Sequence, residues 1–499
     1  MKLLLRAAGL LLALIVVLAL VLVANTLRQG SRQLSVPPLA KIEVDSAAVA
    51  ESLSQAVKAK TVTGLGDPAG LQAALDQLHA HLKARYPLVH SKLEREVVGS
   101  HGLLFTWKGT DAQAKPIALM AHQDVVPIAP GTESLWKKPP FEGTIENGIL
   151  WGRGTLDDKS CLVTILESVE RLLKEGFQPQ RTVYLVFGHD EEVGGAQGAQ
   201  QIVKLLQQRK VQLDWVVDEG LAVTEGVLPG VAKPLALIGL AEKGSVSLKL
   251  SATAAPGHSS MPPAPGNSAI GMLSAALAKL DQNPMPGGVR GAAAAMFDAV
   301  APELPFGQRL AISNLWLTRP LVERMLGKGG ATNAMMRTTT AMTILNAGNK
   351  ENVLPGRADA VVNFRILPGD TAASIQAHVK RVIADDRIEV TPLGVPFEAS
   401  HLASPEAAGY KTIERAVREI FPDALVAPGL MLAASDARHF DAIADNSYRF
   451  MPIRFKPEDL ARPHGTDERI GVDQLGDMVR FYHRLLHLAA GPAPQGTQP

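Results

Sequence analysis

The sequence has almost no cysteine, no basic tract and no internal repeat. Its 499 residues include one cysteine, Cys161, which excludes an internal disulfide. The formal net charge is +1, with 20% charged residues and no cluster of basic residues that could bind phosphates, so we expect no nucleic-acid partner. The lack of a fixed repeat argues against a solenoid or propeller. A chain of this length predicts two or three domains.

A dinucleotide-binding fingerprint is also missing. Gly152 and Gly154 are separated by one residue, but the third glycine of the fingerprint is absent and no strand runs directly into the pair. The two glycines instead allow a tight turn, because glycine tolerates backbone conformations that other residues avoid. This turn would bring Asp157 to the start of a helix predicted over residues 159–175.

The amino terminus contains a long uncharged run, from Ala7 to Asn25, preceded by Lys2 and Arg6. The run is long enough to span a bilayer as a helix. A secretory signal would have a shorter apolar core and a clear cleavage site, whereas Ala24 offers only a weak one. We therefore expect an uncleaved single-pass anchor, with secretion after signal cleavage as the alternative. Lys2 and Arg6 favour a cytoplasmic amino terminus and an exported body, in the periplasm, an organelle lumen or the extracellular space.

Three adjacent carboxylates, Asp190, Glu191 and Glu192, follow an apolar run at residues 182–187 that predicts a buried strand. The end of a strand in an open α/β sheet is the usual position of a ligand crevice. Adjacent carboxylates repel one another, and a bound metal ion would offset that repulsion. The alternative is a solvated acidic turn before a helix.

Acidic residues and a histidine also stand at the ends of predicted strands, or at the start of a predicted helix, elsewhere in the first half of the chain. His122 ends a predicted strand at 116–121, and Asp124 can accept a hydrogen bond from one ring nitrogen while the other binds a metal. A further buried strand ends at Asp218, and Asp157 precedes a helix. Because strand ends lie side by side along one edge of a doubly wound sheet, these residues predict a metal-binding cluster.

The pattern changes after residue 244. Strands and helices are predicted in the order β-α-β-β-α-β between residues 245 and 394, which is typical of a small antiparallel sheet with helices on one face. A Gly-, Pro- and Ala-rich insertion at about 283–337 interrupts it. The predicted divisions are 1–40 for an anchor and linker, 41–243 and 396–490 for two parts of a catalytic domain, 244–395 for a lid or dimerisation domain, and 491–499 for a disordered tail.

Six short motifs occur in one order along the chain. They are His122-x-Asp124, Gly152-x-Gly154-x-x-Asp157-Asp158-Lys159, Asp190-Glu191-Glu192, Asp218-Glu219-Gly220, Gly257-His258-Ser259 and Pro463-His464-Gly465. Over about residues 45–490 this series resembles peptidase family M20, the dinuclear-zinc aminoacylases and carboxypeptidases. With its anchor and insertion, the sequence is most similar to the branch that contains carboxypeptidase S and N-fatty-acyl-amino-acid synthase/hydrolase.

The resemblance implies a fold and a set of ligands. The fold is an α/β zinc-peptidase domain with a mixed, mainly parallel sheet and an inserted α+β, ferredoxin-like domain. Two Zn²⁺ ions per chain are implied, with Asp157 bridging them. The implied ligands are His122 and Asp218 for one ion and Glu192 and His464 for the other.

The resemblance also implies residues that act on the substrate. Glu191 would be the general base, Asp124 would orient His122, and His258 would stabilise the oxyanion, in relatives often across a dimer formed by the small domain. Arg438 resembles the arginine that binds a substrate carboxylate. Asn352 and Arg365 are further substrate-contact candidates, although Arg365 could equally be a solvated charge on a strand.

The chemistry of these residue types agrees with those roles. Paired zinc ions activate a water molecule and polarise a carbonyl, Glu191 can accept the water proton, and a guanidinium can bind a carboxylate in a bidentate pair. The sequence therefore predicts a membrane-anchored amidohydrolase that acts on a peptide or on an N-acyl amino acid. A homologue that binds ligands without catalysis, and a structural protein whose carboxylates cap helices, are the alternatives. The insertion would either line an acyl-binding site or pack as a loop on the small domain.

Overall fold

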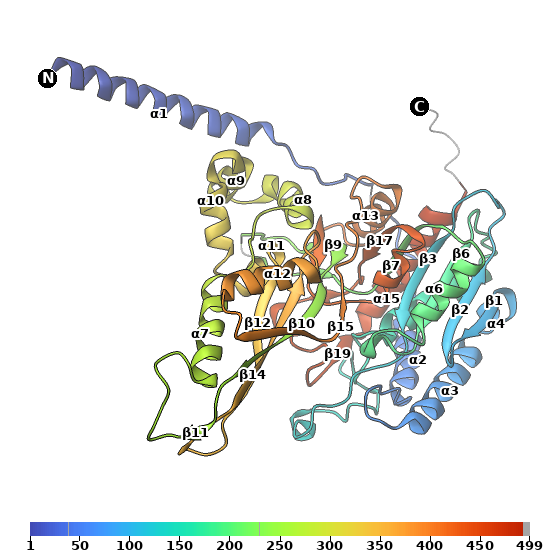
Figure 1. The fold of residues 1–499 in the computed structure, drawn as a ribbon. Coiled ribbons are helices and arrows are strands. Elements are labelled where there is room, and N and C mark those ends of the chain that lie inside the picture. Colours follow the sequence, from blue (N-terminus) through green and yellow to red (C-terminus); the bar gives the residue numbers. More distant parts are fainter. Residues whose placement is uncertain (38, 229, 493–499) are drawn as a thin grey trace.

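The computed structural model describes residues 1–37, 39–228 and 230–492, and two large β-sheets organise it (Figure 1). The larger sheet has ten strands. Nine of them follow one another in the spatial order β1 (Glu94–Val98), β2 (Gly102–Trp107), β6 (Val183–Gly188), β3 (Ile117–His122), β7 (Leu213–Asp218), β17 (Ala444–Arg449), β9 (Leu235–Glu242), β8 (Val223–Thr224) and β18 (Arg454–Phe455), and β16 (Leu425–Met431) pairs with β9.

This sheet is mixed, with parallel strands around β3 and β7 and antiparallel strands at the β1 edge. Strand β3 runs parallel to both β6 and β7, and β7 runs parallel to β17. By contrast, β1, β2 and β6 pair in an antiparallel way. The expected mixed sheet is thus present. Because the carboxyl ends of β3, β6 and β7 lie at the same edge, residues that follow these strands are brought together.

Helices cover both faces of the larger sheet, so its central strands are apolar along their whole length. In β6, Val183, Leu185 and Phe187 pack against one face, whereas Tyr184 and Val186 pack against the other. The helices on the first face include α2 (Ser46–Lys58), α3 (Pro68–Arg85), α5 (Lys159–Lys174), α13 (Ala408–Ile420) and α15 (Val472–Ala490), and those on the second are α6 (Ala199–Gln208) and α14 (Ala437–Phe440).

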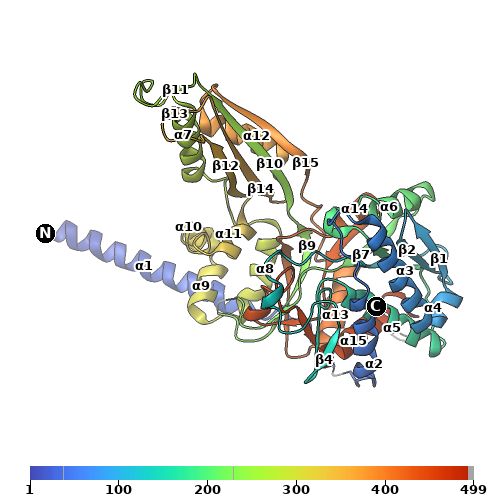
Figure 2. The same cartoon turned by 90° about the horizontal axis from the view of Figure 1, so that it is seen from below.

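The smaller sheet is antiparallel and follows the predicted element order. Its spatial order is β12 (Thr339–Ala347), β14 (Arg357–Ile366), β10 (Gly244–Thr253) and β15 (Ile388–Phe397). Helices α7 (Ala269–Gln282) and α12 (Ala372–Ile383) pack on one face through a separate apolar cluster. At the far end, β11 (Gly257–His258) pairs with β13 (Val353–Leu354) (Figures 1 and 2). The domain boundaries at 243/244 and 395/396 stay predictions.

The insertion is helical rather than a loop. It contains α8 (Gly291–Val300), α9 (Phe306–Ser313), α10 (Leu315–Leu326) and α11 (Gly330–Met336). Four consecutive alanines, 292–295, favour helix in α8 despite the flanking glycines. Helix α8 shares an apolar cluster with β16 and β9, so the insertion packs on the larger sheet. The alternative of a loop that packs on the small domain is therefore wrong, and a role of the insertion in acyl binding stays a prediction.

Helix α1 (Lys2–Arg28) projects from the rest of the protein in both views (Figures 1 and 2). It is long and apolar enough to cross a membrane, and none of its most apolar 18-residue window is buried. Its length and composition support a membrane span, and a signal sequence would meet the same two criteria.

Strand β17 comes from the carboxyl-terminal part of the chain and lies inside the larger sheet. Residues 450–453 separate it from β18. Its neighbour β9, with the sequence Leu-Ala-Leu-Ile-Gly-Leu-Ala-Glu, is almost wholly buried. In the sheet, β17 lies between β7 and β9 and so joins them. Of the predicted disordered tail, residues 493–499 lie outside the described residues.

Candidate metal centre

A cluster of carboxylates and imidazoles lies at the carboxyl end of the parallel strands. His122, the last residue of β3, is buried, and its Nε2 lies 2.9 Å from Asp157 Oδ1 and 3.4 Å from Glu219 Oε1. Its Nδ1 lies 3.0 Å from the main-chain oxygen of Asp124. One imidazole nitrogen is thus held by the protein and the other faces acidic side chains, which is the usual arrangement of a metal-binding histidine.

Asp157 lies between two histidines. Its Oδ1 faces His122, and its Oδ2 lies 3.1 Å from Nε2 of His464. The same His464 nitrogen is 3.1 Å from Glu192 Oε2. Asp157 therefore joins two groups of potential ligands, one around each imidazole. A carboxylate in this position can bridge two cations.

Asp124 positions both halves of this cluster. Besides its contact with His122, it accepts backbone N–H bonds from Glu191 at 3.1 Å and from Glu192 at 3.2 Å. The hydroxyl of Thr63 donates to the same carboxylate at 3.0 Å. These bonds fix the short helix η2 (Glu191–Val193) against the end of β3. As a result, the two adjacent glutamates are held beside His122.

Asp218 and Glu219 lie side by side at the end of β7, with the Glu219 carboxylate closer to His122, and the ligand role of Asp218 stays a prediction. Asp218 ends β7, and its carboxylate accepts backbone N–H bonds from Glu219 at 2.9 Å and from Ala437 at 2.8 Å. The next side chain points the other way, as successive residues of an extended chain do, so the Glu219 carboxylate faces His122. Burial raises the pKa of Asp218 to about 6 and also raises that of Glu219. The sequence motif does not distinguish Glu219 as a ligand, although it belongs to the same acidic group.

Substitutions at these two positions separate their roles. Outer-sphere partners of a metal ligand typically contribute about 10–100-fold to metal affinity. We expect Asp218→Asn to weaken zinc binding within that range, because it perturbs the backbone that carries Glu219. Glu219→Gln should weaken binding further, because it replaces a charged donor. Competition titrations against a zinc chelator measure both affinities, and a larger loss in Asp218→Asn would identify Asp218 as the ligand.

Glu468 is a further buried residue whose role no sequence motif indicates. It accepts backbone N–H bonds from Gly154 at 2.9 Å, Leu156 at 2.8 Å and Asp157 at 3.2 Å. Arg153 balances its charge at 2.7 Å. Gly154 has a φ of +87°, which favours glycine in this turn. The carboxyl-terminal segment therefore holds the loop that presents Asp157.

Glu191 pairs with an arginine rather than with an imidazole. Its Oε1 lies 3.9 Å from the guanidinium of Arg438, which is also 3.8 Å from Glu242 and stacks over the ring of Phe397. Burial raises the pKa of Glu191 well above its ordinary value. The structure therefore places a buried carboxyl and a largely buried arginine side by side next to the histidine cluster.

The charges of the cluster compensate one another. Burial acts to lower the pKa of His122, but surrounding carboxylates, led by Glu219, raise it well above the ordinary value. Hydrogen bonds to Asp157 and Glu192 raise the pKa of His464 to about 10. Asp157 is buried, which raises its pKa, yet His122 and His464 hold it below the usual range. Protons on the imidazoles thus neutralise the carboxylates, and a bound cation would take over that function.

The donor atoms fit metal ions. Imidazole nitrogens and carboxylate oxygens are the ligands that zinc takes in hydrolytic sites. His122, Asp157 and Glu192 offer one such atom each within 4.8 Å of one another, and His122, Asp158 and Glu219 form a second group. In the part of the chain that the structure describes, Glu192 Oε1 is buried without a hydrogen-bond partner. A cation would satisfy this oxygen, since a buried carboxylate oxygen without a partner is costly.

The chain matches the model of a known protein family. The model of "Peptidase family M20/M25/M40" matches residues 118–488, which is most of the chain. The chain belongs to this M20 family. The family resemblance inferred from the six motifs is therefore confirmed, and the α/β fold with a mixed sheet agrees with it. The chain is a hydrolase that acts on amide bonds, as members of this peptidase family do.

Relatives of this M20 hydrolase include two subgroups. It is 40% identical over 483 residues to "Probable carboxypeptidase S-like 2" of Dictyostelium discoideum, covering 95% of this chain and 92% of the relative. It is also 40% identical to "N-fatty-acyl-amino acid synthase/hydrolase PM20D1" of Xenopus tropicalis, covering 87% and 85%. A crystal structure of an M20 family metallo-carboxypeptidase from Sulfolobus solfataricus shares the fold, with a TM-score of 0.61, 19% identity and coverage of 89% and 99%.

The M20 small domain carries two of the predicted site residues at its far end. His258 is exposed in β11, with Nδ1 2.8 Å from the Ser260 hydroxyl. The backbone N–H of Ser259 donates to the main-chain oxygen of Asn352 at 3.0 Å, so His258 and Asn352 are neighbours. Both views place β11 away from the ends of β3 and β7 (Figures 1 and 2). The structure thus brings these two residues together but not to the metal centre of the same chain.

Arg365 lies at the opposite end of the small sheet of this M20 protein. It is exposed on β14, where it faces Ser245 of β10 and Thr339 of β12. Its main-chain neighbours place it near the connection between the two sheets rather than beside His258. The substrate-contact role stays a prediction.

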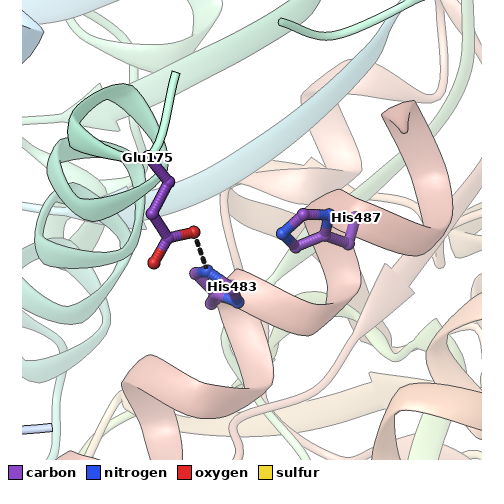
Figure 3. A group of neighbouring side chains, drawn as sticks. All are labelled: Glu175, His483 and His487. Atoms are coloured by element: carbon purple, nitrogen blue, oxygen red, sulfur yellow. Dashed lines mark hydrogen bonds and ion pairs between the residues drawn. The ribbon is translucent and has the colours of Figure 1, made fainter. Parts of the chain in front are cut away.

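A further group of potential ligands is Glu175, His483 and His487, at the end of α5 and on α15 (Figure 3). His483 Nε2 is 2.9 Å from Glu175 Oε2, and Arg171 donates to the other oxygen at 3.0 Å. The rings of His483 and His487 lie 4.8 Å apart on α15. Burial, with the charges of His483 and Arg484, lowers the pKa of His487. Since both Glu175 oxygens already have cationic or imidazole partners, the group fastens the end of α5 to α15.

Proposed function

We propose that this M20 hydrolase uses two zinc ions to cleave an amide bond next to a free carboxylate. The observation that carries the proposal is the position of Asp157 between His122 and His464, with a further carboxylate beside each imidazole. His122, Asp157 and Glu219 would hold one ion, and Asp157, Glu192 and His464 the other. Asp218 supports the first group through the backbone of Glu219.

The protein's own groups account for the proton transfers. Bound zinc ions would lower the pKa of a water molecule and polarise the scissile carbonyl. Glu191 then accepts the water proton and delivers it to the leaving amine. A positioned carboxylate of this kind can act as the general acid–base group of such a reaction. The backbone bonds from Glu191 and Glu192 to Asp124 keep both side chains in place during these steps.

Arg438 would bind the substrate carboxylate. Its guanidinium is largely buried, lies next to Glu191 and is held by Phe397 and Glu242. A planar guanidinium binds a carboxylate through two parallel hydrogen bonds. Arg438 is therefore positioned to fix the free end of a substrate whose amide bond reaches the metal centre.

We expect Arg438→Ala to reduce kcat/KM about 10–150-fold for substrates with a free carboxylate, because a charge-assisted hydrogen bond contributes about 1.5–3 kcal/mol. The same substrates with an amidated carboxyl end should show little change between the parent and the variant. Steady-state rates on both substrate series measure the effect. Arg454→Ala, which removes an arginine paired with Asp423 away from the site, is the matched control. Equal losses on both series would contradict the assignment.

His258 and Asn352 would act from a second copy of the chain. Since His258 lies at the tip of the small domain, a neighbouring molecule can supply it to stabilise the oxyanion. The open edge strand β12 carries exposed apolar residues, among them Ile344 and Leu345, which a dimer contact would cover. We therefore propose a homodimer through the domain at 244–395, which serves as lid and dimerisation unit and has the ferredoxin-like arrangement.

The favoured substrate is an N-acyl amino acid. The support comes from the N-fatty-acyl-amino acid synthase/hydrolases among the relatives and from α1, which we propose to be an uncleaved single-pass anchor that holds an exported body near lipid. A carboxypeptidase is the second candidate, because a carboxypeptidase S-like protein is equally similar to this chain.

The test uses the full chain, purified in detergent and loaded with zinc. A panel of N-acyl amino acids with increasing acyl length is compared with dipeptides, and released amino acid is measured. Faster release as the acyl chain lengthens supports the N-acyl assignment, and preference for dipeptides supports the carboxypeptidase. No release from any substrate by zinc-loaded protein would instead favour a homologue that binds without catalysis.

A further inference from the structure

The carboxyl-terminal end of α1 is bound by the turn between α9 and α10. Asn314 in this turn is fully buried, and its Nδ2 donates to Thr26 Oγ1 at 3.1 Å and to the Leu22 main-chain oxygen at 3.2 Å. Asn25 Nδ2 donates in turn to the main-chain oxygen of Ser313 at 2.8 Å. These polar contacts hold α9 and α10 beside the last turns of α1, as both views show (Figures 1 and 2).

Helix α10 is apolar on two sides. Its inner side carries Val322, which is buried, and Leu315 and Leu326, which pack on the cluster shared with β16. Its outer side exposes a stripe of large apolar residues at helical spacing, with exposed fractions of 63% for Trp316, 44% for Leu317, 59% for Leu321 and 64% for Met325. A solvated helix is normally polar on its outer side. A contiguous exposed apolar surface of this kind marks a contact with another molecule or with lipid.

Trp316 relates this stripe to the end of the candidate membrane span. Its Nε1 donates to Asn314 Oδ1 at 3.3 Å, and Asn314 in turn holds Thr26. Trp316 therefore lies at the level of the last turns of α1, where the uncharged run ends at Asn25. Tryptophan is enriched at the boundary between the hydrocarbon core and water, because its ring is apolar and its N–H is polar.

The charge of this region suits an anionic surface. Between Phe306 and Gly330 the basic residues are Arg309, Arg319, Arg324 and Lys328, and Glu323 is the one acidic residue. Four positive charges and one negative charge give a net charge of +3. An apolar helix face bordered by basic residues is typical of segments that lie in a lipid headgroup region.

We propose that the outer side of α10, together with Phe306 of α9, lies in the headgroup region of the bilayer that α1 spans. The proposal rests on the proposed membrane insertion of α1. The protein then has two membrane contacts, a spanning helix and an interfacial one, connected by Asn314. A single flexible anchor would let the catalytic domain rotate freely, whereas two contacts fix its orientation to the surface from which acyl substrates would come.

The experiment labels single introduced cysteines with an environment-sensitive fluorophore. The native Cys161 is fully buried, so surface labelling is selective. Full chains carrying Leu321→Cys, Ile15→Cys within α1, or Leu65→Cys are reconstituted into phosphatidylcholine vesicles with about one third phosphatidylglycerol. Leu65 is 64% exposed in the segment before α3 and is the matched control. Quenching is measured with a nitroxide on the lipid chain near the headgroup for positions 321 and 65, and with one near the methyl end of the chain for position 15, which would lie near the bilayer centre. Hydrolysis of a soluble substrate reports the fold.

Strong quenching at position 321 and little at position 65 is the expected result. Quenching at 15 without quenching at 321 would overturn the interfacial contact and leave the anchor intact. Absence of quenching at both 15 and 321 would overturn both proposals. Quenching at 321 but not at 15 would support the interfacial contact and reject the spanning helix. A shifted emission at 321 that lipid quenchers leave unchanged would indicate contact with a second protein copy and would overturn the bilayer assignment.

Discussion

Glu191→Gln is expected to reduce amide hydrolysis by about 10³-fold while leaving the zinc content unchanged. General acid–base groups contribute about 10²–10⁴-fold to a rate, and the amide cannot accept the proton that the carboxylate accepts. The side chain pairs with Arg438 rather than with an imidazole, so its replacement should not remove a metal ligand. Single-turnover rates and elemental analysis of the same preparation measure the two quantities.

The neighbouring residue supplies the control for this result. Glu192 lies 3.1 Å from His464, so Glu192→Gln should lower both the rate and the zinc content. The two variants differ by one position in the chain and change the same chemical group. If Glu191→Gln also lost zinc, or if it kept the parent rate, Glu191 would not be the general base.

Asp157→Asn should release zinc from both positions and reduce the rate by at least about 10³-fold. An asparagine side chain offers one oxygen, so it cannot face both His122 and His464 as the carboxylate does. Loss of the metals removes several kcal/mol of transition-state stabilisation, and each 1.4 kcal/mol corresponds to a factor of about ten. Zinc per chain after gel filtration in dilute chelator is the direct measurement.

The matched control is Asp214→Asn. Asp214 lies near the start of β7, at the end of the strand away from the metal centre, and pairs with Arg181 at 2.6 Å. It should retain the parent zinc content and rate. Full zinc retention in Asp157→Asn would show that the two groups of ligands bind independently, without a shared carboxylate.

Much of the candidate site is predictable from where the apolar runs of the sequence end. His122 ends β3 and the pair Glu191 and Glu192 follows β6, and these strands are adjacent and parallel. Apolar runs specify where buried strands end, and sheet geometry then brings the ends together. His464 is a different case, since it lies in a loop with φ +60° and follows no strand. The family motif alone predicts it.

The remaining differences depend on contacts between distant parts of the chain. Asp218 and Glu219 are both acidic, so the sequence does not indicate which carboxylate faces His122. The direction of the backbone after β7 determines this. Glu468 gains its role from three N–H groups more than 300 positions earlier in the chain. The location of His258 depends on how the two sheets are oriented, which residue patterns within each sheet do not determine. Such long-range relations appear only in the folded chain.

The position of β17 also has a consequence for biosynthesis. Strands β7 and β9 are separated by β17, whose residues 444–449 are among the last to be synthesised. Until this segment emerges, the nascent chain has two open strand edges that can pair with other chains. Non-local pairing of this kind is slow and exposes intermediates to aggregation. We therefore expect the protein to need a holding chaperone during its synthesis, and premature stop codons before residue 444 should yield insoluble chains rather than partly active ones.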